Sequence, residues 1–276
     1  VGLLNVLEER DVQVRGYKVR LPLDVYLVAS ANPEDYTNRG RIITPLKDRF
    51  GSQIRTHYPL EIETEVSIAL AEAVPLEAEG VRVTVPDYMT EVVATLSHLA
   101  RSSPHINQRS GLSVRFTITN HEVMVANATR RALRHGEKDV APRVSDLEAL
   151  PASMMGKIEI ESLEEGRDAQ IAENLVKAAV LTVFKERFTP ERFRPIVTAF
   201  EEGAVIHAGE DVTSAEYVSL LEQQPALREA VTDLTGGDES AASVASAVEL
   251  LLEGLHLSKG LNKDGVGARA TYRARA

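Results

Sequence analysis

Two polar side chains, Asn32 and Arg49, are spaced so that they could read the phosphates of a nucleotide. Asn32 ends the apolar run YLVASA just before a proline, and Arg49 closes a short amphipathic piece in LKDRF. An amide at a strand end can orient a water in line with a γ-phosphate, and a guanidinium from a neighbouring subunit can neutralise charge on the phosphoryl group. The pair therefore predicts phosphoryl-transfer chemistry. The plainer alternatives are an Asn-Pro turn and a surface ion pair of Arg49 with Asp48.

Two further arginines, Arg109 and Arg115, flank the start of a long predicted helix in the segment NQRSGLSVR. A helix N-terminus favours anions, so an arginine there and the helix dipole would both face a phosphate. Arg115 is the first candidate for such a contact and Arg109 is a close competitor. The alternative is that both arginines cover a polar helix end.

An α/β region must position the first pair. DVQVRGYKVRLP alternates around Gly16 and predicts a hairpin with strands near 11–15 and 17–21. DVYLVAS is a continuous β-rich run, which is typical of a strand buried on both faces of a parallel sheet. A short helix near 43–49 and a strand near 52–58 complete this region.

From Glu61 onward the apolar residues recur at helical spacing. We expect a helix from Glu61, a β-like connector at 81–85, a helix capped by Asp87 and running to about Ser102, and a long helix closed by Gly136. Residues 144–152 add one or two helical turns. The long helix expected at 166–188 has an apolar stripe made of Ile171, Leu175, Ala178, Ala179, Leu181 and Phe184.

The C-terminal part is also expected to be mainly helical, with helices near 213–223 and 240–256 and a TGGDES linker at 235–240. From Leu257 on, five basic residues face one acidic residue without apolar periodicity. This pattern favours a solvated, disordered end.

Composition limits the classes of function. The chain has 276 residues, of which 43% are apolar and 26% charged, and the formal net charge is −10. Such a charge argues against nucleic-acid binding by the chain as a whole. No cysteine is present, none of the seven histidines forms an H-E-x-x-H pattern, and no apolar run approaches the roughly 20 residues that span a membrane. We expect a cytoplasmic protein without a metal site of its own side chains.

The stretch from Tyr26 to Pro59 closely resembles the AAA+ ATPases of the magnesium chelatase ATPase subunit and MoxR branch. The resemblance implies that Asn32 is the sensor-1 residue and Arg49 the arginine finger, and that Arg115, or Arg109, is the sensor-2 arginine of a helical lid. It also implies that the hairpin is the insertion that lines the central pore. ATP and Mg²⁺ would bind between subunits of a hexameric ring, alongside a von Willebrand factor A-domain partner.

The resemblance divides the chain into four parts. Residues 1–60 would be the C-terminal part of a parallel-sheet α/β core, 61–152 an all-helical lid, 153–258 a helical extension, and 259–276 the basic tail. The chain contains neither a G-x-x-x-x-G-K-[ST] loop nor an acidic Walker B strand. Since Val1 is not a methionine, we expect the true N-terminus to lie upstream, in a parent protein that hydrolyses ATP while this fragment alone does not. The alternative is a non-catalytic helical scaffold or adaptor with an ATPase-like shape.

Overall fold

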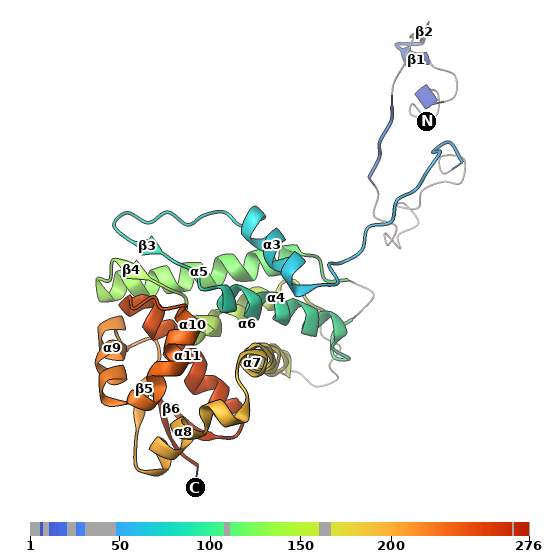
Figure 1. Ribbon diagram of the computed structural model, residues 1–276. Helices are drawn as coiled ribbons and strands as arrows, with labels where there is room; N and C mark the ends of the chain where they lie inside the picture. The colour runs from blue at the N-terminus through green and yellow to red at the C-terminus, as the bar shows by residue number, and fades with distance from the viewer. Residues whose placement is uncertain are drawn as a thin grey trace. The chain divides into compact units, whose positions relative to one another are not determined.

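The computed structural model describes the residues 6–7, 11–20, 26–30, 48–107, 111–159, 167–266 and 268–275 (Figure 1). The chain divides into two units, Val1–His57 and Tyr58–Ala276, and each is described by itself. The architecture is mixed α/β and mostly helical. In the described part of the chain, no helix is both long enough and apolar enough to cross a membrane.

The first unit contains the predicted hairpin. Strands β1 (Asp11–Val14) and β2 (Tyr17–Arg20) pair antiparallel. The turn between them uses Arg15 and Gly16, whose φ angles are 51° and 84°. Two consecutive positive φ values match the right-handed twist of the strands, as in a type I′ turn. The hairpin prediction is confirmed.

The two core strands expected in the first unit are not formed in the described residues. Residues 26–30 and 52–58 carry no strand, and the side chains of Tyr26, Val28 and Ile54 are 91%, 80% and 89% exposed. A β-rich run becomes a buried strand only when neighbouring strands satisfy its backbone groups and cover its faces. Within the described residues these segments have no such neighbours, so the prediction was wrong here. The helix expected at 43–49 falls mostly outside the described residues.

The second unit begins with the helical elements that the sequence predicted. These are α3 (Ile62–Glu72), α4 (Asp87–Ser102), α5 (Arg115–His135), the 3-10 helix η2 (Val144–Ala149) and α6 (Leu150–Met155). Gly136 closes α5 with a φ of 69°, as expected of a C-cap glycine. The expected cap of α4 is corrected, because Pro86 occupies the N-cap position and Asp87 is the first helical residue.

The helices that follow are α7 (Arg167–Arg187), α8 (Pro190–Glu201), α9 (Ser214–Gln223), the 3-10 helix η3 (Pro225–Leu227), α10 (Arg228–Thr235) and α11 (Ala241–Leu257). The sequence predicted α7, α9 and α11 but not α8 or α10. α8 was not predicted because Pro195 lies inside it, and an internal proline normally argues against a helix.

The predicted apolar stripe of α7 is rotated relative to the buried face. The buried residues are Ala172, Val176, Ala179, Val180, Val183 and Phe184, so only Ala179 and Phe184 belong to both sets. α7 packs along α4 on one side and against α11 on another (Figure 1). The buried face of α7 is therefore determined by its contacts with both α4 and α11, which the apolar periodicity of α7 alone does not reveal.

Short sheets accompany these helices. β3 (Arg82–Val83) pairs parallel with β4 (Asp139–Val140), which bears out the connector expected at 81–85. The second sheet has the order β5-β7-β6, from strands β5 (Ile206–Ala208), β6 (Leu261–Val266) and β7 (Arg269–Ala274).

This second sheet corrects the prediction of a disordered tail at 259–276. β6 and β7 form an antiparallel hairpin whose residues Leu261 and Tyr272 are buried. The Tyr272 hydroxyl donates a hydrogen bond of 2.6 Å to Glu253 of α11. Packing against a helix thus holds a segment whose basic composition suggested a solvated end.

The cores also correct the boundary expected between lid and extension. One apolar cluster joins Val92 of α4 and Phe116 of α5 to Val180 of α7 and Leu250 of α11. A second cluster extends from Phe184 to Tyr272. Because the first cluster contains residues from both sides of position 152, residues 61–152 and 153–258 belong to one compact unit.

Candidate functional site

The structure describes two of the four predicted site residues. Asn32 and Arg109 lie outside the described residues. Arg49 sits in a turn of the first unit and is partly buried. Arg115 is the first residue of α5 in the second unit, and its side chain is exposed. Since the two described residues belong to different units, each is considered within its own.

The start of α5 has the electrostatic character expected of a site that receives an anion. Its N-cap residue Val114 makes no side-chain cap, and no acidic residue lies in its first turn. By contrast, the first turns of α3 and α4 carry Glu63, Glu65 and Asp87. The helix dipole leaves partial positive charge at this end, where the Phe116 N–H donates to the Ser113 carbonyl at 2.9 Å and the Thr117 hydroxyl donates to the buried Glu65 carboxylate. Arg115 adds a full positive charge at the same place.

A buried carboxylate, Glu65 of α3, holds this end of α5 in place. The Arg101 guanidinium donates to both Glu65 oxygens at 2.6 and 2.7 Å, and the Thr117 hydroxyl donates to the same carboxylate. His98 Nε2 lies 2.9 Å from Glu65 Oε2, and Arg101 Nε donates to the Leu112 carbonyl at 3.0 Å. A bidentate arginine–carboxylate pair fixes orientation as well as distance. The first turn of α5 is therefore anchored to α3 and α4.

Sequence reasoning did not find Glu65. Acidic residues near a helix start usually face water, and Glu65 is fully buried. The available signal was its spacing of four from Ala69, the other buried residue of α3. A carboxylate on the apolar face of a helix indicates a buried partner elsewhere in the fold.

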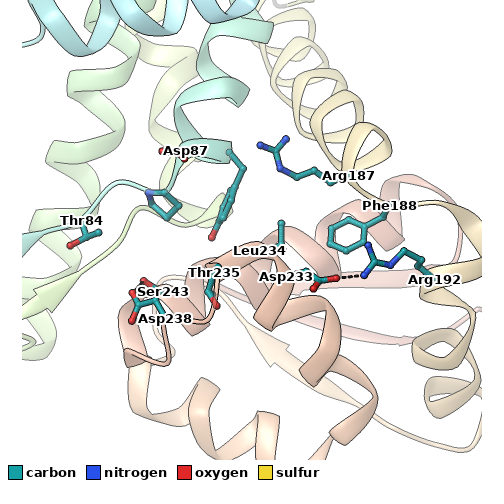
Figure 2. A pocket seen from close by; sticks show the side chains of 13 residues that line it. Thr84, Asp87, Arg187, Phe188, Arg192, Asp233, Leu234, Thr235, Asp238 and Ser243 are labelled. Atoms are coloured by element: carbon teal, nitrogen blue, oxygen red, sulfur yellow. Dashed lines mark hydrogen bonds and ion pairs between the residues drawn. The ribbon is translucent and has the colours of Figure 1, made fainter.

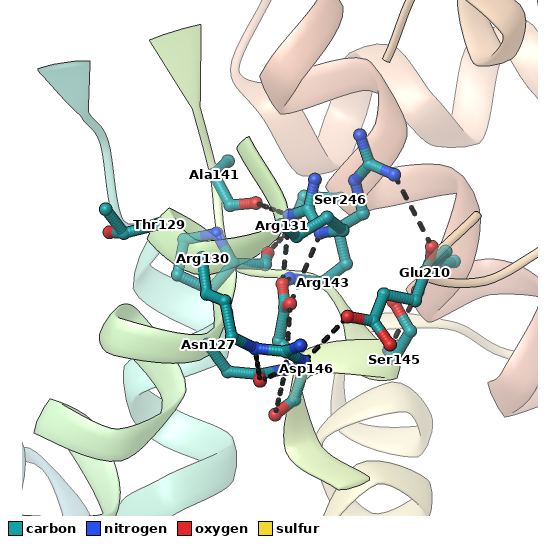
Figure 3. Close-up of polar contacts among 12 residues, drawn as sticks. Asn127, Thr129, Arg130, Arg131, Ala141, Arg143, Ser145, Asp146, Glu210 and Ser246 are labelled. Atoms are coloured by element: carbon teal, nitrogen blue, oxygen red, sulfur yellow. Dashed lines mark hydrogen bonds and ion pairs between the residues drawn. The ribbon is translucent and has the colours of Figure 1, made fainter. Parts of the chain in front are cut away.

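A second buried ionic network lies at the other end of α5 (Figure 3). Arg131 donates from Nε and Nη2 to Asp146 at 3.2 and 2.9 Å, and Nη2 also reaches the Ala141 carbonyl at 3.0 Å. The Arg143 backbone N–H donates to Asp146 at 2.8 Å, and its guanidinium donates to the Val212 carbonyl at 2.8 Å. The network joins α5 and η2 to the segment that precedes α9.

The charges in this network are compensated unequally, because burial, with the nearby charge of Arg131, lowers the pKa of Arg143, and burial raises the pKa of Asp146 despite its pairing with Arg131. Burial lowers the pKa of the Arg131 guanidinium, but the charges of Asp146, Glu249 and Glu137, with the Asp146 hydrogen bond, more than offset this and leave the pKa raised. Arg131 therefore stays protonated. Arg131, Arg143 and Asp146 are all fully buried, so the cluster has no surface to offer a substrate. Its effect is structural.

A cavity with a volume of about 740 Å³ lies between the start of α4 and the ends of α7 and α10 (Figure 2). Arg187 and Arg192 line it, but Arg187 pairs with Glu91 at 2.6 Å and Arg192 pairs with Asp233. With both arginines neutralised, the cavity offers a phosphate little attraction. Neither Arg49 nor Arg115 is among its lining residues.

Within the described ranges, no group of three or more His, Asp or Glu side chains is arranged to hold a metal ion. Comparison of the chain with protein-family models, with curated proteins and with solved structures found no match.

Proposed function

We propose that this chain is the sensor and lid portion of an AAA+ ATPase of the magnesium chelatase ATPase subunit and MoxR branch. In this proposal ATP and Mg²⁺ bind between the subunits of a cytoplasmic homo-oligomeric ring, most simply a hexamer. The phosphate loop comes from another part of the parent protein, because the chain itself contains no G-x-x-x-x-G-K-[ST] sequence. Hydrolysis drives the remodelling of a partner, such as a von Willebrand factor A-domain protein, or the insertion of a metal ion.

One observation carries the proposal, namely the start of α5. An exposed arginine stands at the first position of a 21-residue helix whose N-terminus has neither a side-chain cap nor an acidic residue. The buried Glu65 cluster fixes that turn relative to α3 and α4. A lid that reports nucleotide state needs a cation near the phosphates, and an arginine at the start of an anchored helix supports this proposal.

The hairpin of the first unit is consistent with the same function. Arg15, Tyr17, Lys18 and Arg20 are all exposed, and the side chain of Tyr17 is 79% exposed. Arg15 lies in the turn, Tyr17 and Lys18 follow it, and Arg20 lies at the open end of the hairpin opposite Asp11. In this proposal the exposed aromatic and basic side chains contact a polypeptide at the centre of the oligomer.

The second candidate function is a scaffold or adaptor without catalysis. It is favoured by the contacts of Arg143 with the Val212 carbonyl and of Ser145 with Glu249, which connect the expected lid to the expected extension within one unit. These contacts would hinder a lid that must move independently of the extension, whereas they would stabilise a scaffold. If the ATPase proposal is correct, the lid and extension move together.

The two candidates separate in the full-length parent protein. We expect Arg49→Ala to lower ATP turnover by about 10³-fold or more, because the finger acts only as charge develops on the transferred phosphoryl group. ATP affinity should remain nearly unchanged. Arg55→Ala is the matched control, since Arg55 is an exposed arginine of the same unit. Mixing Arg49→Ala with a Walker B variant should restore partial activity, as each subunit supplies what the other lacks.

Arg115→Ala should instead weaken ATP binding, by about tenfold or roughly 1.4 kcal/mol. Arg228→Ala is its control, because Arg228 is likewise an exposed arginine at the first position of a helix, α10. Wild-type turnover in Arg49→Ala together with wild-type affinity in Arg115→Ala would refute the ATPase proposal and leave the scaffold.

Asn32→Ala should lower hydrolysis while ATP affinity changes by less than about tenfold, roughly 1.4 kcal/mol. The reason is that an amide that orients the attacking water contributes mainly to the transition state. An equal loss of binding and turnover would point to a turn with only a structural role.

A further inference from the structure

Negative charge is concentrated in the segment from Tyr58 to Val81, which contains α3 and the loop that follows it. The segment has six glutamates and no aspartate, lysine, arginine or histidine, so it carries −6 of the chain's formal net charge of −10. α3 packs against α4 and α5 (Figure 1). The exposed side chains of residues 60–79 are called the α3 surface below.

Large apolar side chains are concentrated on the same segment. In the described residues of the second unit, eight such side chains are exposed, and five of them lie between Tyr58 and Leu76. Leu60, Leu70 and Val74 are 77%, 57% and 74% exposed. Single exposed apolar residues are ordinary on a protein surface, whereas a group of them indicates a place where another molecule binds.

The carboxylates of the α3 surface have no counter-ions in the described part of the chain. Glu65 is fully buried and pairs with Arg101, so it does not belong to the surface. The other five glutamates of the segment are exposed and form no ion pair, namely Glu61, Glu63, Glu72, Glu77 and Glu79. Uncompensated negative charge therefore lies beside the exposed apolar groups.

The helical part of the surface has a regular outer face. Glu63, Ser67 and Leu70 follow one another at intervals of four and three residues, and residues at these intervals share one face of a helix. The buried residues of α3, Glu65 and Ala69, lie on the opposite face. The outer face thus combines a carboxylate, a hydroxyl and a large apolar side chain.

The loop after α3 is held by its own backbone contacts. The Val74 N–H donates to Glu122 of α5 at 2.9 Å, and Ala78 and Val81 form a β-bridge. With the backbone of the helix and of these loop residues already bonded, the surface offers no open strand edge to an extended peptide. A partner must therefore satisfy its own backbone hydrogen bonds, as a helix does.

We propose that the α3 surface binds a basic amphipathic helix of another protein. Its apolar side chains would lie against Leu70, Val74 and Leu76, and its lysine or arginine side chains would reach the glutamates at the two ends of α3. Complementary charge speeds association and disfavours partners of like charge. Nucleic acids, anionic membranes and a second α3 surface are such partners. The proposal does not rest on the ATPase function.

Fluorescence anisotropy with a labelled peptide of lysine and leucine tests the chemistry of the partner. The peptide has its leucines on one face of about four helical turns, roughly 14 residues. We expect it to bind this chain and to gain helicity, measured by circular dichroism. Replacing its leucines by serine, or its lysines by glutamate, should each weaken binding by about tenfold or more. Unchanged affinity after either replacement would overturn the proposal.

Variants with equal net charge locate the electrostatic part of the site. Glu77→Gln combined with Glu79→Gln should weaken binding of the peptide by about fivefold or more. Glu201→Gln combined with Glu202→Gln is the control, because it removes the same charge from exposed glutamates at the end of α8 and should leave the affinity unchanged. Equal losses in the two variants would mean that net charge alone attracts the peptide, which refutes the site.

A leucine variant tests the apolar part without disturbing the core. Leu70→Ser should weaken peptide binding by about tenfold. Leu133→Ser, which alters a leucine of α5 that is 59% exposed, should not. Light scattering distinguishes the remaining occupant. If the peptide does not bind, and the chain self-associates in a way that Leu70→Ser abolishes, the α3 surface joins copies of this chain and the proposal is wrong.

Discussion

The two units of the chain differ in how well the β propensity of a segment agrees with the formation of a strand. In the first unit, the β-rich segments around Val28 and Ile54 have exposed side chains and no strand partners among the described residues. In the second unit, β6 and β7 have a less β-like composition and nevertheless form a hairpin that covers α11. Partners, more than propensity, decide whether a segment becomes a strand. The following predictions test this contrast, from the largest expected effect to the smallest.

Arg131→Met should destabilise the second unit most. It removes one member of a fully buried pair and leaves Asp146 without its main counter-charge. Breaking such a pair costs about 3–5 kcal/mol. Urea unfolding followed by circular dichroism measures the loss. Arg130→Met, one residue away on the exposed side of α5, should cost less than about 1 kcal/mol. Similar losses for both variants would contradict a structural role for the buried network.

Gly254→Ala should destabilise the packing of α11 against α7. A Cβ at Gly254 would lie 2.2 Å from ring atoms of Phe184, and a buried ring cannot move aside freely. Overpacking of this kind costs about 1–3 kcal/mol. Gly265→Ala is the control, because nothing lies within 4 Å of a Cβ there. Thermal unfolding of the two variants should give a lower Tm for Gly254→Ala alone.

Stability should fall when the pH is lowered through the ordinary pKa of histidine, in part because of His121. Burial lowers the pKa of His121, although the nearby Glu122 opposes this. Below about pH 6.5 the unfolded chain therefore binds a proton that the folded chain does not, and the free energy of unfolding falls as the pH falls. His121→Leu should make the urea midpoint less dependent on pH between 7.5 and 5. His105→Leu, at an exposed position, should leave that dependence as in the wild type.

The smallest effect is expected in the first unit. Ile54→Ser should change stability by less than about 0.5 kcal/mol, because the side chain is 89% exposed. Amide hydrogens of residues 52–57 should exchange rapidly in this chain. If the full-length parent supplies neighbouring strands, the same amides should be protected there. Rapid exchange in both proteins would mean that this segment is not part of a sheet.

Local features could be predicted from the sequence, and non-local ones could not. The hairpin around Gly16 and the end of α5 at Gly136 depend on glycines with positive φ, which act within a few residues. The β5–β7 pairing joins Ile206 to Tyr272 across the intervening helices, and no local sequence pattern predicts it. The lack of a domain boundary at position 152 could not be predicted either, because it depends on the packing of α7 against α4, which is distant in the sequence.

The residues of the candidate site show the same difference between local features, which could be predicted, and non-local ones, which could not. The position of Arg115 at the start of a helix was predictable because helical periodicity is a local feature. Glu65 and Arg131 were not, since a charged residue on a helix normally faces water and only its distant partner reveals that it is buried. The roles of Asn32, Arg49, Arg109 and Arg115 remain predictions.

The length of α5 and the contacts at its two ends have a mechanical consequence. Its 21 residues extend roughly 30 Å at 1.5 Å per residue. At the far end from Arg115, Arg134 pairs with Glu210 and Asp211 at 3.0 and 2.7 Å, and His135 contacts the Glu210 backbone at 2.8 Å. Polar contacts thus tie both ends of α5 to other segments of the second unit. Because a helix is stiff along its axis, we expect an axial displacement of its first turn to be transmitted to the loop after β5.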